Sequence, residues 1–166
     1  MYSIKKAAAA VVAVLAVTGA VTAAAPASAG QVRQAGGNVR FFNEATGGSL
    51  DANGSGAPVA ITWQPNGTAF QDWILRPLGP VFLIESVARR GSCLQAPPNS
   101  GDVIRLAPCN PNNPTQAWEL DRVGDKFVIA EATDENFVIE ATSNTNPVVK
   151  QFRDENPNQL WDVTPS

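Results

Sequence analysis

The chain carries Gln71-Asp72-Trp73, Gln116-Ala117-Trp118 and Gln159-Leu160-Trp161, which are three copies of the pattern Gln-x-Trp. The copies are 45 and 43 residues apart, and a similar tetrapeptide, such as Ser49-Leu50-Asp51-Ala52 in the first unit, precedes each of them. Self-similarity at a regular spacing indicates structural repeats. The pattern predicts one domain over 39–166, made of three units at 39–79, 80–124 and 125–166.

Each unit is expected to form short strands separated by turns. In the third unit the predicted strands are 127–130, 138–141, 148–152 and 161–163, with a turn at 134–136 after the first. Every stretch of 10 to 12 residues that could show a helical period is interrupted by a Gly or a Pro, so an all-β fold is expected. Four strands in each of three units give about twelve strands. A β-propeller has repeats of similar length but needs at least four blades, so three units must close differently.

The N-terminal segment has the features of a secretory signal peptide. Lys5 and Lys6 precede an apolar run of mostly Ala and Val, and the small-residue site Ala27-Ser28-Ala29 follows. Residues 1–29 are therefore predicted to be cleaved, which leaves 30–38 as a short segment before the domain. The alternative is a membrane anchor, but the small-residue site follows directly and no charged stop-transfer flank does. We expect a secreted, extracellular protein without a membrane contact after cleavage.

The composition excludes several kinds of function. The chain has no histidine, so Ser-His-Asp and Cys-His catalysis are excluded, as are most zinc sites. Its formal net charge of −3 gives no basic footprint for nucleic acid. No residue cluster indicates a metal site or a cofactor. Acidic residues are frequent, but none form a recognisable catalytic pair, so we do not expect an enzyme.

Export places the two cysteines, Cys93 and Cys109, in an oxidising compartment, where a disulfide between them is expected. The alternative is two free thiols. Their spacing excludes a Cys-x-x-Cys redox site.

Taken together, these motifs resemble the ricin B-type lectin family. The resemblance rests on the three Gln-x-Trp repeats, the pair Cys93-Leu94, and Pro108-Cys109 before the second Gln-x-Trp. It implies a β-trefoil, in which six strands form a barrel and three hairpins cap one end with pseudo-threefold symmetry. It also implies that the two cysteines pair within one repeat. The implied activity is non-catalytic binding of carbohydrate, either galactose-type sugars or a polysaccharide, by a protein that we expect to be a monomer.

The tryptophans and glutamines of the motif are expected to serve the fold. Trp73, Trp118 and Trp161 occupy one position of each repeat, which suits a shared core. The glutamine two residues earlier is expected to lie in a strand, where its amide can tie the backbone of a turn.

In ricin-type repeats a carboxylate follows the Cys-Leu pair, an aromatic residue comes later, and an Asn precedes the Gln-x-Trp. The carboxylate accepts hydrogen bonds from sugar hydroxyls and the aromatic ring stacks on the sugar's C–H face. The first repeat matches with Asp51, Trp63 and Gln71, but has Phe70 in place of the Asn.

The other two repeats differ from each other in how well they match. The third has Glu140, Phe152 in the aromatic position, and Asn158 and Gln159. The second has no element of a site, because Gln95, Ala107 and Thr115 stand at the three positions. Sugar sites are therefore predicted in repeats one and three.

A protease inhibitor is the alternative function, because β-trefoils present stiff loops. Arg89 and Arg90 lie just before Cys93, in a loop that the disulfide would tether. A basic side chain there would be placed to fill a trypsin-like pocket.

Overall fold

The computed structural model describes residues 37–166. The predicted signal peptide lies outside the described residues. Between residues 37 and 166, no helix is long and apolar enough to cross a membrane.

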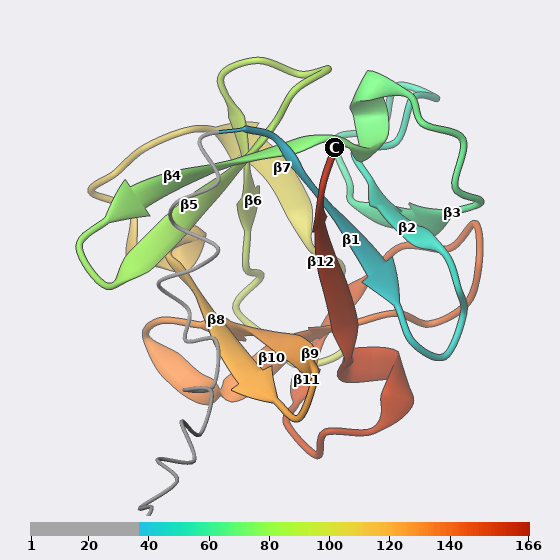
Figure 1. Cartoon of the computed structure of the whole chain (residues 1–166). Helices are drawn as coiled ribbons and strands as arrows, with labels where there is room; N and C mark the ends of the chain where they lie inside the picture. The colour runs from blue at the N-terminus through green and yellow to red at the C-terminus, as the bar shows by residue number, and fades with distance from the viewer. Residues whose placement is uncertain (1–36) are drawn as a thin grey trace, which may run out of the picture.

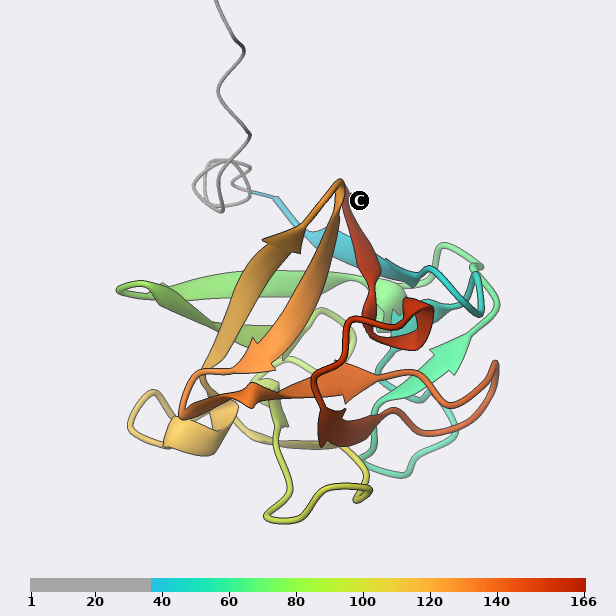
Figure 2. The ribbon, with the colours of Figure 1, turned by 90° about the horizontal axis from the view of Figure 1, so that it is seen from below.

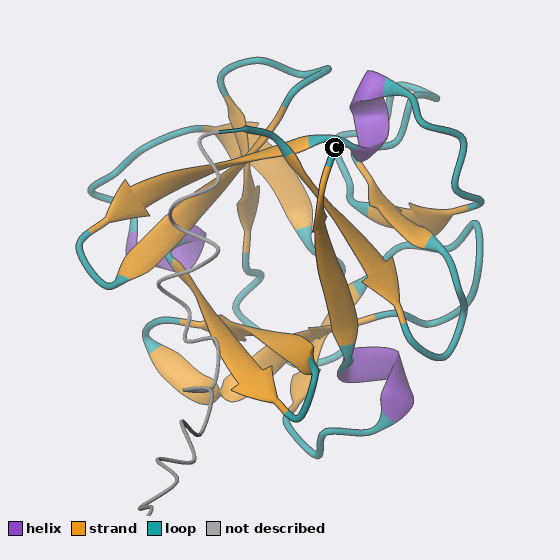
Figure 3. Ribbon diagram, in the orientation of Figure 1, coloured by secondary structure: helices purple, strands orange, loops and turns teal. Residues whose placement is uncertain are grey.

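The described chain is built from strands and single-turn 3-10 helices, as Figure 3 shows. The strands are β1 (Val39–Asn43), β2 (Ser49–Asp51), β3 (Ile61–Trp63), β4 (Trp73–Leu78), β5 (Val81–Ser86), β6 (Ser92–Gln95), β7 (Arg105–Pro108), β8 (Trp118–Val123), β9 (Lys126–Glu131), β10 (Asp134–Glu140), β11 (Val149–Phe152) and β12 (Trp161–Pro165). The 3-10 helices are η1 (Ala69–Gln71), η2 (Pro114–Gln116) and η3 (Pro157–Gln159).

Six of the strands close a barrel. Following the antiparallel pairs, β1 joins β4, β4 joins β5, β5 joins β8, β8 joins β9, β9 joins β12, and β12 returns to β1. Closure removes the unpaired sheet edges that would otherwise invite aggregation. The pairing of β12 with β1 brings the end of the chain beside the first described strand, as Figures 1 and 2 show.

Three hairpins, β2–β3, β6–β7 and β10–β11, complete the fold. They meet in a cycle of backbone hydrogen bonds: the amide of Ala60 donates to the carbonyl of Ile104, Ile104 to Val148, and Val148 to Ala60, each at 3.0 Å. This cycle has one member from each repeat, which is the expected pseudo-threefold symmetry. The fold is a β-trefoil, as predicted.

The three motif tryptophans are buried in one core, as the sequence predicts. Trp73, Trp118 and Trp161 are each at most 1% exposed. Each indole N–H donates to a backbone carbonyl in the hairpin of its own repeat: Leu50 at 3.0 Å, Leu94 at 3.1 Å and Ile139 at 3.3 Å. Because a buried indole needs this partner, the tryptophan fixes the hairpin to the barrel.

One covalent link and one buried ion pair join separate segments of the fold. The predicted disulfide Cys93–Cys109 is confirmed, with 5.0 Å between the Cα atoms. The Lys150 Nζ forms a buried ion pair with Glu131 at 2.7 Å and lies 4.4 Å from the centre of the Phe137 ring.

Two local predictions are wrong. The turn expected at 134–136 is part of β10, because Asp134 pairs with Glu131 and the polar residues extend the hairpin beyond the core with an irregular register. The motif glutamines do not lie in strands: each is the last residue of a 3-10 helix, and the following strand begins only at the tryptophan.

Candidate sugar site

The hydrogen bonds of the motif glutamines define equivalent positions in the three repeats. Each Gln amide nitrogen donates to the last residue of a hairpin or the one after it: Gln64 at 2.9 Å, Pro108 at 3.0 Å and Phe152 at 2.7 Å. Each amide oxygen accepts from a backbone N–H two residues further on, in Asn66, Asn110 and Asp154. The glutamines therefore tie a loop to the fold, as predicted.

Gln71 and Gln159 are fully buried, which argues against the direct contact with sugar that the sequence predicts for them. Their amides instead meet the acidic position of the same repeat. The Gln159 Nε2 donates to Glu140 at 2.8 Å, and a hydrogen bond from the Gln71 side chain reaches Asp51. These two glutamines are supports for the acid.

In the first repeat, Asp51 and Trp63 line the same hollow. The hollow has a volume of about 300 Å³ and is also bounded by the Phe70 ring and by Ile61. Asp51 lies at the end of β2 and is only 4% exposed, whereas Trp63 at the end of β3 is 40% exposed. The structure thus brings together a recessed carboxylate and an accessible aromatic ring, the two elements that the sequence places in this repeat.

Burial dominates the electrostatics of Asp51. Loss of water around the carboxylate raises its pKa above the ordinary value of 3.8. Hydrogen bonds from the Asn53 backbone N–H, at 2.8 Å, and from Gln71 act in the opposite direction, as does the positive charge of Arg89. The carboxylate is therefore held in place by its neighbours but retains acceptor capacity, since Asp has two oxygens.

The rim of the hollow is formed by two turns that bond to themselves. The Asn53 Oδ1 accepts from the N–H and hydroxyl of Ser55, and the Asn66 Oδ1 accepts from the N–H and hydroxyl of Thr68. Sequence reasoning missed these rim residues. The Asn-Gly pairs at 53–54 and 66–67 are the only available signal, because they mark tight turns.

In the third repeat, Glu140 is equivalent to Asp51, but its carboxylate is more heavily engaged. It accepts from Gln159 at 2.8 Å and from the Asn156 side chain at 3.4 Å. Asn158 is half-buried, and its backbone carbonyl accepts from Ala141 and from the Asn43 side chain.

Phe152 does not occupy the position equivalent to Trp63. Trp63 pairs with Ser49, the residue before Leu50, whose carbonyl accepts the indole bond of repeat one. In repeat three the corresponding carbonyl is that of Ile139, and the residue before it, Val138, pairs with Gln151. Phe152 lies one residue later, opposite Phe137, and the two rings are 4.5 Å apart at an angle of 36°. Phe152 is 60% exposed, so it forms an accessible aromatic surface beside the predicted position.

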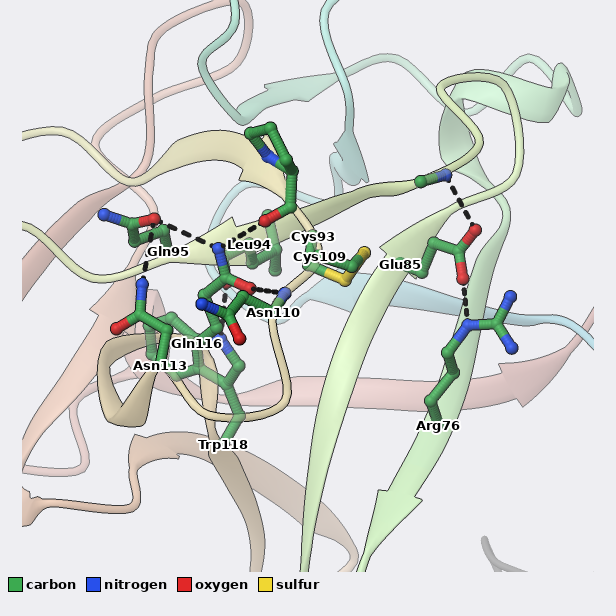
Figure 4. The surroundings of a disulfide bond; sticks show 12 residues. Arg76, Glu85, Cys93, Leu94, Gln95, Cys109, Asn110, Asn113, Gln116 and Trp118 are labelled. Atoms are coloured by element: carbon green, nitrogen blue, oxygen red, sulfur yellow. Dashed lines mark hydrogen bonds and ion pairs between the residues drawn. A yellow bond between two sulfur atoms is a disulfide. The ribbon is translucent and has the colours of Figure 1, made fainter.

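In the second repeat, Gln95 occupies the position that holds an acid in the other two repeats. The Gln95 Oε1 accepts from Gln116 at 3.1 Å and from Asn113 at 3.4 Å, next to the disulfide (Figure 4). Ala107 stands at the position of Trp63, since it pairs with Cys93. Neither a carboxylate nor a stacking ring is present at these two positions.

The two arginines of the alternative hypothesis differ in accessibility. The Arg89 Nε donates to the carbonyl of Ala52 at 2.9 Å, and its Nη2 donates to that of Asn53 at 2.6 Å. Arg89 could enter a protease pocket only by breaking both bonds. Arg90 is exposed.

Comparison with known proteins identifies the family and the fold. The family model described as a ricin-type beta-trefoil lectin domain matches residues 37–161. A search of curated proteins gave no significant match.

Among solved structures, the designed threefold-symmetric protein ThreeFoil superposes with a TM-score of 0.69 at 17% identity, over 78% of this chain and 99% of that one. The C-half of the earthworm R-type lectin, in complex with GalNAc, gives 0.63 at 21% identity over 78% and 99%. The ricin B-like lectin of Macrolepiota procera, in complex with lactose, gives 0.66 at 21% identity over 79% and 96%. At these identities the likeness of the structures concerns the fold, and the family rests on the matched model. The chain belongs to the family of ricin-type β-trefoil lectin domains.

Proposed function

We propose that this protein is a secreted, non-catalytic carbohydrate-binding protein whose principal sugar site lies in repeat one. The single observation that carries the proposal is the hollow in which the recessed carboxylate of Asp51 faces the same space as the accessible ring of Trp63. Family membership gives this arrangement its interpretation.

The chemistry of the hollow suits a pyranose. A carboxylate accepts hydrogen bonds from two adjacent hydroxyls, and charged acceptors form the stronger hydrogen bonds. The Trp63 ring offers a flat apolar face for the C–H patch of a sugar. Phe70 adds a second apolar wall beside Asp51, which favours a ligand that turns a hydrophobic face or substituent toward it.

The proposed ligands are galactose-type sugars, alone or within a polysaccharide. Two structural neighbours were solved with such ligands, the earthworm lectin with GalNAc and the Macrolepiota procera lectin with lactose. The net charge of −3 also favours a neutral glycan over a polyanion.

Repeat three is proposed as a second, weaker site. Glu140 supplies a carboxylate, Asn158 lies nearby in sequence and fold, and Phe152 with Phe137 supplies the aromatic surface. Because the trefoil fixes the distance between repeats, two weak sites would gain avidity on a polymer or a glycan-dense surface.

The test is a glycan array supplemented with soluble polysaccharides, probed with protein that begins at Gly30. Discrete binding that is lost in Asp51→Ala and in Trp63→Ala is expected. The matched control is Gln95→Ala, which places an alanine at the equivalent position of repeat two and should leave binding unchanged. Binding that survives both repeat-one variants but is lost in Glu140→Ala would move the principal site to repeat three.

Secretion has its own test. N-terminal sequencing of protein recovered from the medium of an expressing culture is expected to begin at Gly30. Protein retained in the membrane fraction with its first residues intact would contradict secretion.

A further inference from the structure

Arg89 belongs to repeat two, but its side chain contacts repeat one beside the proposed sugar site. Its guanidinium reaches across to the segment that follows Asp51 and bonds to the carbonyls of Ala52 and Asn53, at 2.9 and 2.6 Å. We propose that Arg89 is a positioning residue that holds the Asp51 carboxylate in its place in the repeat-one site. This inference rests on the proposed function, because that function makes the Asp51 carboxylate a sugar acceptor. Its first test needs no sugar.

The segment that Arg89 holds adopts an unusual backbone conformation. Asn53 has φ of +53°, in the left-handed region that residues other than glycine rarely occupy. In this conformation its N–H points back to the Asp51 Oδ1, at 2.8 Å, and its side chain binds Ser55. The orientation of the carboxylate therefore depends on a turn that needs external support.

The loop that carries Arg89 is well anchored. The amide of Val87 donates to the carbonyl of Asp72, and that of Ala88 to Ala69 in η1. The Glu85 Oε1 accepts from the amide of Gly91 at 2.9 Å, on the other side of Arg89. These bonds hold the backbone around Arg89 against η1, the helix that also carries Gln71, the neighbour of Asp51.

Arg89 donates to backbone carbonyls and forms no ion pair with Asp51 within the described part of the chain. A guanidinium placed directly on the carboxylate would use both of its oxygens in a bidentate pair. By binding the carbonyls instead, Arg89 brings a positive charge near Asp51 and leaves acceptor capacity for sugar hydroxyls.

The other repeats have no counterpart of Arg89. Backbone hydrogen bonds define the equivalent positions. The amide of Val87 donates to the carbonyl of Asp72, as the amide of Ala132 does to Ala117 and that of Glu44 to Leu160. Arg89 lies two residues after Val87, and the residues two after Ala132 and Glu44 are Asp134 and Thr46. Neither side chain has a guanidinium, so this clamp distinguishes repeat one from its two copies.

The test compares Arg89→Ala and Arg89→Lys with the control Arg90→Ala, which removes the same charge from the exposed neighbour. The first readout needs no sugar: carbon-detected NMR titration of the Asp51 carboxyl, together with the amide shifts of Asn53 and Gly54. Arg89→Ala is expected to raise the pKa of Asp51 and to move both amides, and Arg90→Ala is expected to change neither.

The second readout is affinity for a glycan whose binding requires Asp51. Arg89→Ala should weaken it about tenfold, since two hydrogen bonds that fix the site are lost, with partial recovery in Arg89→Lys. A purely structural role would instead lower the melting temperature and leave the affinity of the folded protein unchanged, which would overturn the proposal.

The two readouts separate this inference from the proposed function. If no glycan binds the wild-type protein, the proposed function fails, while a shift of the Asp51 pKa and the two amides in Arg89→Ala still supports positioning. An unaltered pKa and unaltered amides overturn the inference whether or not sugar binds. If Arg89→Ala does not fold, Arg89→Lys takes its place. Because lysine keeps the charge but cannot reproduce both bonds, shifts of the Asn53 and Gly54 amides then support the inference, and unaltered amides overturn it.

Discussion

Gln116 offers the sharpest test of the structural role of the Gln-x-Trp motif, because repeat two has no acid whose loss could confuse the result. Its side chain is 1% exposed and makes three hydrogen bonds: from Asn110 at 2.8 Å, to Pro108 at 3.0 Å and to Gln95 at 3.1 Å (Figure 4). At about 1 kcal/mol for each bond, Gln116→Ala should lower the free energy of unfolding by about 3 kcal/mol. In a domain of this size that corresponds to a fall in melting temperature of roughly 10 °C.

The assay is urea unfolding followed by tryptophan fluorescence, with thermal unfolding as a second measurement. Gln64→Ala is the matched control, since the Gln64 side chain is exposed and should change stability by less than about 0.5 kcal/mol. Gln116→Met separates packing from hydrogen bonding, because it fills the space but leaves the buried partners of Gln116 unsatisfied. A loss below about 0.5 kcal/mol in both Gln116 variants would refute the view that this amide ties the loop to the fold.

Three further predictions concern other parts of the molecule. Removing the disulfide in Cys93→Ser/Cys109→Ser should lower the free energy of unfolding by about 3 kcal/mol, and reductant should then have no further effect on thermal unfolding. Because burial raises the pKa of Asp51 and the charged form accepts the sugar hydroxyls, affinity should fall as the pH drops through that raised pKa. Calorimetric titrations across acidic pH measure this, and a midpoint at or below 3.8 would contradict it. Lys150→Met should lower the free energy of unfolding by about 3–5 kcal/mol, because it leaves Glu131 buried without its partner. Adding Glu131→Gln should recover part of this loss. Equal stabilities of the single and double variants in urea unfolding would argue against a coupled pair.

The sequence is most informative about features that repeat. Trp73, Trp118 and Trp161 mark the threefold core because one physical requirement, a large buried ring with a hydrogen-bonded N–H, recurs in each unit. The spacing of Cys93 and Cys109 likewise falls within a single repeat, where the disulfide forms. The pattern itself predicts three units of short strands, and the family resemblance that these residues carry implies the β-trefoil.

The candidate site depends on finer detail than a repeat pattern contains. The sequence pattern predicts Phe152 at the position of Trp63, yet the β10–β11 register places Gln151 there. A shift of one residue moves a side chain to the opposite face of a strand, so an alignment that is correct to within one residue is insufficient.

Contacts between repeats also cannot be predicted from the local sequence pattern. Nothing in the local pattern around Arg89 indicates that its side chain bonds to Ala52 and Asn53, which lie 37 and 36 residues earlier. The sequence suggested an exposed basic loop, whereas the chain uses this arginine to support a neighbouring repeat. Such roles emerge only when the barrel brings the loops together.

The most direct test of the central claim is to map a bound glycan on the protein by NMR. The measurement follows backbone amide shifts while the best glycan from the array is titrated into protein that begins at Gly30. The account predicts that the largest shifts fall in 51–55 and 63–70 around the repeat-one hollow, and that they disappear in Asp51→Ala. Shifts confined to another part of the surface, with no change at Asp51 or Trp63, would contradict the assignment of the principal sugar site to repeat one.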